Sequence, residues 1–203
     1  MEQNRAKQIP YGIQDFVQVI TQNYYYVDKT MYIPKLEDSH NNLFCIRPRR
    51  FGKSVLLSML HAYYDCRTKD KFQEWFGDLW IGKHPTPLQG RYQILHLDFS
   101  QVGGTIENLE EKFNFYLGVQ LNGFVRDYLE FYSEKVQRQV EETKDAGGKL
   151  AIIQSEARSK NYPLYLIIDE YDNFTNTVLN EQGENVYWAI THAEGFYRDI
   201  FKK

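Results

Sequence analysis

The stretch Arg47–Ser54 (RPRRFGKS) follows the short apolar run Leu43–Ile46 (LFCI) and precedes a segment with helical periodicity. A short apolar run bounded by polar residues and proline is typical of a buried parallel strand. Apolar side chains then recur at positions 55, 56, 59, 60 and 63, which is the spacing of one helix face. The sequence therefore predicts a strand, a tight loop and a helix in succession.

Three residues at the end of this stretch have the chemistry of a phosphate-binding loop. Phosphate binds where backbone N–H groups converge at the N-terminus of a helix, whose dipole carries about half a positive charge. Gly52 permits close approach of the backbone, Lys53 reaches the β- and γ-phosphates, and the Ser54 hydroxyl ligates Mg²⁺. Because this tripeptide also occurs by chance, the alternative is a surface turn that caps the helix.

An arginine, Arg47, occupies the position where a phosphate loop of this pattern has its first glycine. Pro48 fixes its own φ and biases Arg47 toward an extended conformation. We expect Arg49 and Arg50 to bring positive charge beside the phosphates, and we assign nucleotide binding to Arg47 and Arg50. The alternatives are that the three arginines contact another partner, such as nucleic acid, or are solvated.

A second apolar run, Leu164–Glu170 (LYLIIDE), ends in two adjacent acids. In open α/β sheets, ligands bind at the carboxyl edge of the strands, where this run delivers Asp169. The sequence predicts that Asp169 holds Mg²⁺ and that Glu170 is the catalytic base, which polarises an attacking water. A solvated strand end is the alternative. Asp98 and Ser100, at the end of another predicted strand, are candidates for the same crevice or for a simple turn and cap.

The alternation of strands and helices indicates an α/β fold with a largely parallel sheet flanked by helices. We expect Tyr24–Lys29 to be a packed strand, with the lining of an adenine pocket as the alternative. We expect Lys69–Pro87 to be a loop-rich insert whose aromatic residues form a satellite core. The other predicted elements are a strand at 93–99, a long helix at 106–131 with Thr105 as N-cap, and helices near 13–21, 31–36, 149–160 and 186–201.

Composition limits the class of protein. The chain has 203 residues, of which 42% are hydrophobic, which is enough for one α/β domain. The net charge of -3 argues against a globally basic nucleic-acid binder. The two cysteines belong to no metal-binding pattern, and no apolar run reaches the roughly 20 residues that cross a bilayer. We expect a cytoplasmic protein that uses no membrane.

Five segments together resemble the AAA-ATPase-like family of bacterial, Bacteroides-type, P-loop proteins. They are IPYGIQDF (9–16), YYYVDKTMYI (24–33), RPRRFGKSVLLSML (47–60), LHLDFS (95–100) and LIIDEYDNF (166–174). The resemblance implies a lead-in segment, residues 1–42, packed on a P-loop NTPase core, residues 43–203. It also implies ATP and Mg²⁺ as ligands and an arginine–proline loop as part of the family's own pattern.

Carried over by position, the resemblance assigns nucleotide binding to Gly52, Lys53 and Ser54, the magnesium-binding Walker-B acid to Asp169 and the base to Glu170. Family members often continue into a half that resembles a PD-(D/E)XK nuclease, a candidate partner domain. In this fold class a sensor strand follows the Walker-B strand and inserts beside the P-loop strand. Since one predicted helix follows here, we expect an incomplete sheet without the sensor strand and later elements.

Two functions follow as expectations. The first is an ATPase module that couples MgATP binding and hydrolysis to a partner domain. The second is a nucleotide-binding or protein-interaction module that does not hydrolyse ATP, favoured by the glycine-poor loop and the missing sensor strand.

Overall fold

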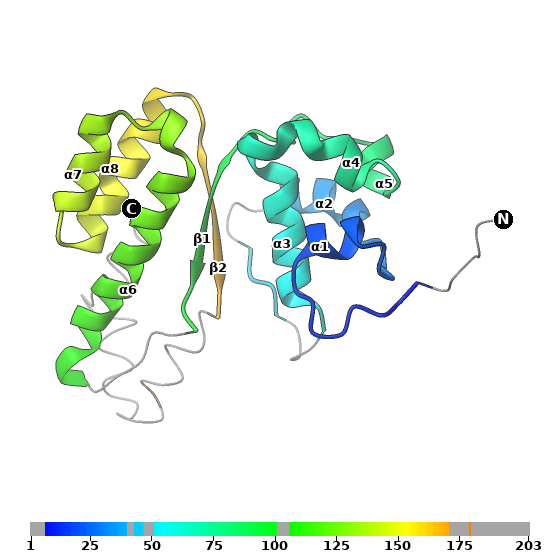
Figure 1. Ribbon diagram of the computed structural model, residues 1–203, viewed down its shortest axis with the longest axis horizontal. Helices are drawn as coiled ribbons and strands as arrows, with labels where there is room; N and C mark the ends of the chain where they lie inside the picture. Colours follow the sequence, from blue (N-terminus) through cyan, green and yellow to red (C-terminus); the bar gives the residue numbers. More distant parts are fainter. Residues whose placement is uncertain (1–6, 40–42, 47–50, 101–105, 171–178, 180–203) are drawn as a thin grey trace. The chain divides into compact units, whose positions relative to one another are not determined.

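The computed structural model describes residues 7–39, 43–46, 51–100, 106–170 and 179 (Figure 1). The chain divides into two compact units, Met1–Tyr92 and Gln93–Lys203, and each is described by itself. The predicted domain boundary after residue 42 stays a prediction. Within the described ranges, no helix combines the length and apolar character required to cross a bilayer.

The first unit is helical in its described part. Its central element is α3, Lys53–Tyr64, which confirms the predicted helix after the phosphate loop. The other elements are α1 (Phe16–Thr21), η1 (Thr30–Tyr32), α2 (Ile33–Glu37), η2 (Cys66–Lys71), α4 (Phe72–Phe76) and α5 (Trp80–Lys83).

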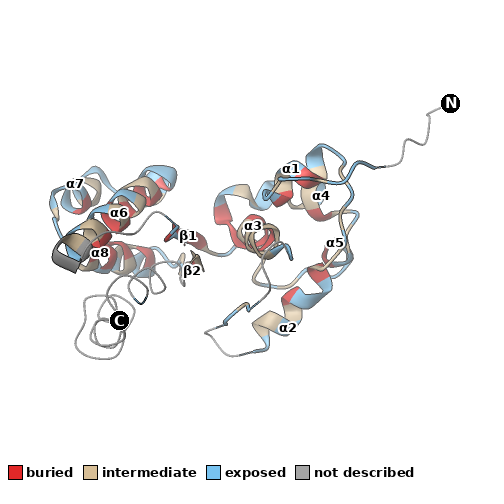
Figure 2. Ribbon diagram, turned by 90° about the horizontal axis from the view of Figure 1, so that it is seen from below, coloured by how far each residue is buried: buried red, intermediate tan, exposed pale blue. Residues whose placement is uncertain are grey.

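An aromatic core joins these helices. Phe16 and Phe76 are fully buried and stacked, with ring centroids 4.9 Å apart, and Tyr63 of α3 meets Phe76 edge-on at 5.5 Å. The backbone N–H of Phe16 also donates a hydrogen bond of 3.0 Å to Ser58 Oγ on α3. Figure 2 shows the buried residues of α1, α3 and α4. Phe76, expected in a satellite core, therefore belongs to the main core of this unit.

The prediction of a loop-rich insert at Lys69–Pro87 is wrong, because this segment contains the end of η2 and all of α4 and α5. Helices of four to six residues are marginal in isolation and depend on tertiary packing. For α4 this packing comes from Phe76, whose ring stacks on Phe16 of α1 and meets Tyr63 of α3 edge-on.

The prediction of a buried strand at Leu43–Ile46 is also wrong. These residues have no strand conformation, and the side chains of Leu43, Phe44 and Ile46 are 48%, 76% and 85% exposed. A four-residue apolar run becomes a strand when a neighbouring strand pairs with its backbone, and the two strands described below pair with each other. The expected strand at Tyr24–Lys29 is absent for the same reason, and Tyr25 is exposed.

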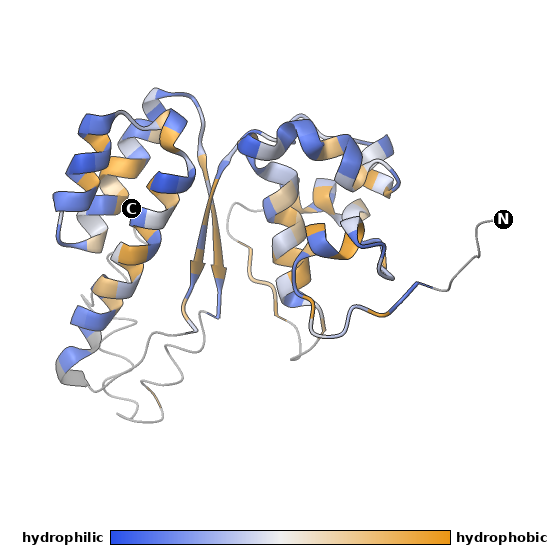
Figure 3. Cartoon of the chain, in the orientation of Figure 1, coloured by the Kyte–Doolittle hydropathy of each residue, from blue (hydrophilic) through white to orange (hydrophobic). Residues whose placement is uncertain are grey.

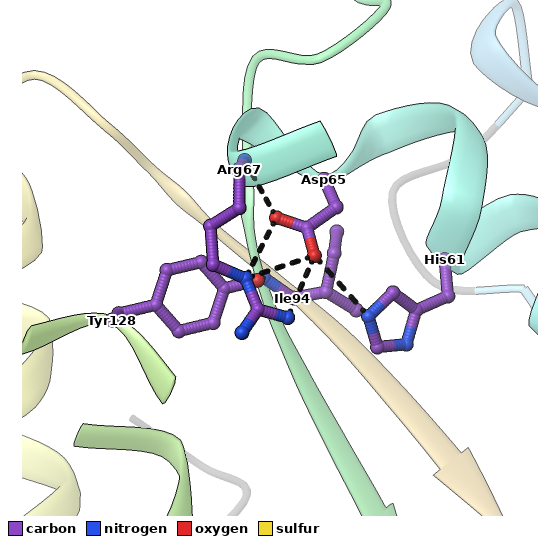
Figure 4. A network of polar contacts seen from close by, with 5 residues as sticks. All are labelled: His61, Asp65, Arg67, Ile94 and Tyr128. Carbon is purple, nitrogen blue, oxygen red and sulfur yellow. Dashed lines mark hydrogen bonds and ion pairs between the residues drawn. The ribbon is translucent and has the colours of Figure 1, made fainter. Parts of the chain in front are cut away.

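A buried carboxylate closes the C-terminal end of α3. Asp65 is 1% exposed and accepts hydrogen bonds from the Arg67 backbone N–H at 2.9 Å and from Arg67 Nη2 at 2.8 Å (Figure 4). His61 Nε2 lies 3.4 Å from the same carboxylate. Burial alone would raise the pKa of Asp65, but the hydrogen bonds from His61 and Arg67 outweigh it and lower the pKa to about 2.

The second unit contains a parallel pair of strands. β1 (Gln93–Asp98) and β2 (Leu164–Asp169) pair in register from Gln93 with Leu164 to Asp98 with Asp169. The helices α6 (Ile106–Asp127), α7 (Glu134–Glu142) and α8 (Ala146–Ser159) lie on one side of this pair (Figures 1 and 2), and η3 (Leu129–Phe131) follows α6. The predicted mixed fold, with a parallel sheet flanked by helices, is confirmed at this level.

The long helix α6 confirms the predicted amphipathic pattern. Hydrophobic residues recur along it between hydrophilic ones (Figure 3), and Phe113, Leu117 and Leu121 are buried. Just beyond its end, Tyr128 Oη accepts a 2.8 Å hydrogen bond from the backbone N–H of Ile94 in β1 (Figure 4). The predicted N-cap Thr105 and the predicted helix at 186–201 lie outside the described residues.

Helix α7 has no counterpart among the predicted elements. Its described core contribution is a single buried residue, Val140, so its apolar periodicity is weak. A side chain from the neighbouring helix α8 caps the C-terminal carbonyl groups of α7. Lys149 of α8 is 5% exposed, and its Nζ donates to the carbonyl oxygens of Val140 and Glu141 and, at 2.9 Å, to Asn122 Oδ1. Burial of this ammonium lowers the pKa of Lys149.

We expect Asp65→Asn to destabilise the first unit by about 2 kcal/mol at pH 7. The pKa of this carboxyl falls from 3.8 to about 2 on folding, and that difference corresponds to about 2 kcal/mol. Because the folded-state pKa is depressed, this stability is present above about pH 4 and is lost as the pH falls toward 2. Chemical denaturation of wild type and variant from pH 7 to pH 3 measures it.

The exposed carboxylate of Asp78 provides the control, since Asp78→Asn removes a charge without a buried partner. A stability difference between wild type and Asp65→Asn that stays constant from pH 7 to pH 3 would show that packing, and not the charge, explains the loss.

Candidate functional site

The first group of predicted site residues lies at the start of α3. Gly52 is the N-cap residue, with φ of +75°, and its carbonyl oxygen accepts the first helical hydrogen bond, from Leu56 N–H, at 3.1 Å. Since glycine has no side chain, α3 begins without a side-chain cap. Lys53 and Ser54 are half-buried in the first turn, and Gly52 is exposed. The backbone N–H groups of a helix start therefore lie beside a lysine and a serine, as phosphate binding requires.

The left-handed conformation explains why this position is a glycine. A side chain there would have space, because a Cβ atom on Gly52 would meet Lys29 Nζ at 3.9 Å, an ordinary contact distance. The conformation itself costs an L-residue roughly 1–2 kcal/mol. Gly52 is thus required for the direction of the backbone. Arg47 and Arg50 lie outside the described residues, and their roles stay predictions.

The second group lies at the carboxyl end of β2. Asp169 is the last residue of this strand and is the register partner of Asp98, the last residue of β1. Directly paired residues of parallel strands direct their side chains to the same face of a sheet. The structure therefore places Asp98 beside Asp169, as expected for residues of one crevice.

Gln120 of α6 holds the backbone of Asp98 from both sides. The N–H of Asp98 donates to Gln120 Oε1 at 2.7 Å, and Gln120 Nε2 donates to the Asp98 carbonyl oxygen at 3.1 Å. The Asp98 carboxylate accepts from the Ser100 N–H at 2.8 Å. This last bond is the turn-and-cap role considered for Asp98 and Ser100. Nothing in the sequence pattern singled out Gln120.

Glu170, the predicted base, has a left-handed backbone with φ of +53°, and its N–H donates to Asp169 Oδ1 at 2.9 Å. Positive φ is uncommon for a residue other than glycine, asparagine or aspartate, and it costs about 1–3 kcal/mol. Such conformations cluster at functional sites, where the surrounding structure maintains them. Among the described site residues, Glu170 is the one residue other than glycine with a left-handed backbone.

Asp169 is a candidate ligand for a magnesium ion that also takes phosphate oxygens. In the described part of the chain, no three or more His, Cys, Asp or Glu side chains form a cluster that could hold a metal ion. Mg²⁺ takes one or two carboxylates and completes its six ligands with phosphate oxygens and water. Asp169 has the chemistry of such a carboxylate ligand, and Ser54, taken by itself, has that of a hydroxyl ligand.

The two groups belong to different compact units, so their geometry is given group by group. Sequence reasoning identified both groups, did not single out Gln120, and considered Lys29 only as part of the segment Tyr24–Lys29, whereas the structure brings Lys29 Nζ close to Gly52. The signal for Lys29 is the segment YYYVDKTMYI, where the residues on either side of the lysine are hydrogen-bonding types.

Comparisons with known proteins identify the family. No solved structure matches this chain. A segment of 55 residues is 46% identical to the "Uncharacterized protein in vnfD 5'region" of Azotobacter chroococcum mcd 1, and it covers 27% of this chain and 11% of that protein. Residues 10–203 match the AAA-ATPase-like family, described as "Predicted AAA-ATPase". The match extends over both groups of site residues, and the chain belongs to the AAA-ATPase-like family.

Proposed function

We propose that this chain binds ATP with Mg²⁺ and is the nucleotide-binding part of an ATPase. The observation that carries the proposal is the left-handed Gly52 at the start of α3, directly before Lys53 and Ser54. That conformation turns the backbone into the helix at the point where a phosphate would meet its first N–H groups. Membership of the AAA-ATPase-like family supports the same reading.

Each residue of the proposed site has a distinct role. The Lys53 ammonium binds the β- and γ-phosphates, and Ser54 and Asp169 hold the magnesium ion, which neutralises phosphate charge when bound. Glu170 accepts a proton from the attacking water. Arg47 and Arg50 add positive charge beside the phosphates.

Hydrolysis removes the γ-phosphate and with it the contacts that this group makes, which is how nucleotide state is transmitted in P-loop proteins. We propose that the chain couples this change to a partner domain, for which a nuclease-like domain in the same polypeptide is the candidate. A polypeptide that carries both parts is the sample in which this coupling can be measured.

We expect Lys53→Ala to weaken MgATP binding by about 10- to 100-fold, because a hydrogen bond to a charged phosphate contributes about 1.5–3 kcal/mol. Isothermal titration calorimetry of the chain with MgATP measures the change. Lys83→Ala, which removes an exposed lysine of α5, is the matched control. No heat of binding with the wild-type chain would refute the proposed function.

Two glycine substitutions separate backbone strain from phosphate binding. Gly52 and Gly12 have φ of +75° and +76°, so Gly52→Ala and Gly12→Ala should each destabilise the first unit by about 1 kcal/mol. Gly52→Ala alone should also weaken MgATP binding, because it disturbs the phosphate loop. Thermal unfolding and calorimetry of both variants test this. Equal MgATP affinity of the two variants would contradict the assignment of Gly52.

We expect Glu170→Gln to retain MgATP binding and to lose turnover by about 10²- to 10⁴-fold, the usual contribution of a general base. A phosphate-release assay with saturating MgATP measures turnover, and Glu142→Gln, at an exposed position of α7, is the control. A wild-type chain that binds MgATP without any turnover would favour the module that binds and does not hydrolyse.

A further inference from the structure

Lys29 lies in a segment that the proposed function does not yet use, Asp28–Thr30. Asp28 Oδ1 accepts hydrogen bonds from the backbone N–H of Thr30 at 2.8 Å and from its hydroxyl at 2.7 Å. Asp28 Oδ2 accepts from the Trp80 N–H at 2.7 Å, and Thr30 Oγ1 accepts from the Ile81 N–H at 3.1 Å. The residues on both sides of Lys29 are therefore anchored to the start of α5.

This anchoring fixes the backbone from which the Lys29 side chain extends. Thr30 is fully buried, and Lys29 itself is half-buried. Both carboxylate oxygens of Asp28 are already used as acceptors for backbone or hydroxyl donors. The hydrogen bonds of Asp28 thus fix the backbone of this segment, and the Lys29 side chain with its ammonium group extends from that backbone.

The Lys29 ammonium lies at the phosphate loop. Its Nζ is 3.9 Å from the position that a Cβ atom would take on Gly52, the N-cap of α3. In the part of the chain that the structure describes, no carboxylate lies within ion-pair distance of this ammonium. Lys29 and Gly52 are 23 positions apart in the sequence, so tertiary structure creates this proximity.

The electrostatics of this position favour an anion. The N-terminus of a helix carries a partial positive charge, and a cation beside it is destabilising without a compensating negative charge. Lys53, in the first turn of the same helix, adds a second ammonium to the local field. Two lysines at the positive end of one helix dipole are stabilised when a polyanion binds there.

We propose that Lys29 is a second phosphate-binding lysine of the nucleotide site and contacts the phosphates of ATP together with Lys53. This inference rests on the proposed function, because it assigns a further residue to the same site. Lys29 acts as a binding residue, and Asp28 and Thr30 position it.

The test compares MgATP binding by wild type, Lys29→Gln, Lys29→Arg and the control Lys35→Gln, using calorimetry at about 50 mM and about 200 mM salt. Lys35 is exposed on α2 and lies over the Tyr32 ring, remote from the phosphate loop in sequence. We expect Lys29→Gln to bind MgATP about 10-fold more weakly, and Lys29→Arg and Lys35→Gln to stay near wild type. The affinity of Lys29→Gln should also depend less on salt, because one phosphate contact by a cation is missing.

Three results would contradict the assignment of Lys29 or the proposed function. Lys29→Gln affinity equal to that of Lys35→Gln would show that Lys29 does not contact the nucleotide. Weaker binding with the salt dependence of wild type would assign Lys29 a structural role in the loop. A wild-type chain that binds no MgATP would refute the proposed function itself, an outcome distinct from the other two.

Discussion

The buried carboxylate of Asp65 is the polar interaction on which the arrangement of the first unit depends. It ends α3, caps η2 and binds both Arg67 and His61. Directly after it, the Cys66 N–H donates to the Tyr92 carbonyl oxygen at 2.9 Å, and the Tyr92 N–H donates to the Tyr64 carbonyl oxygen at 3.0 Å. These contacts fix the C-terminal end of α3, and the aromatic core packs on its side; Lys53 and Ser54 lie in its N-terminal turn.

Both groups of site residues lie where a regular element begins or ends, and both contain a left-handed residue. At Gly52 the conformation is compatible with the residue type, since glycine has no Cβ. At Glu170 it is not, and the hydrogen bond from Glu170 N–H to the Asp169 carboxylate is one of the interactions that accompany it. A strained residue directly after an acid at a strand end is consistent with selection for position rather than for stability.

The second unit also uses polar side chains at the ends of its elements, of which Lys149 is buried and Gln120 is half-buried. Lys149 caps the carbonyl end of α7, and Gln120 holds the last residue of β1. Both are long side chains from a neighbouring helix, so each fixes one element relative to another, and for Lys149 this requires the burial of a charged group. Gln120 lies 22 positions from Asp98, and Lys149 lies 8–9 positions from the carbonyl groups that it binds, so no local sequence pattern predicts these contacts.

The sequence by itself determined the elements with a long or strong pattern, namely α3, α6, β1 and β2, and the types of the residues at their ends. Periodicity identifies such elements because their buried faces repeat, and Gly52, Lys53, Ser54, Asp169 and Glu170 are recognisable from their chemistry alone. Tertiary structure decided the rest. Leu43–Ile46 has no strand conformation, since neither of the two described strands pairs with it, while α4, α5 and α7 depend on contacts with distant residues. Lys29 reaches the phosphate loop because Asp28 and Thr30 bind α5, a constraint between residues about 50 positions apart that no local pattern contains.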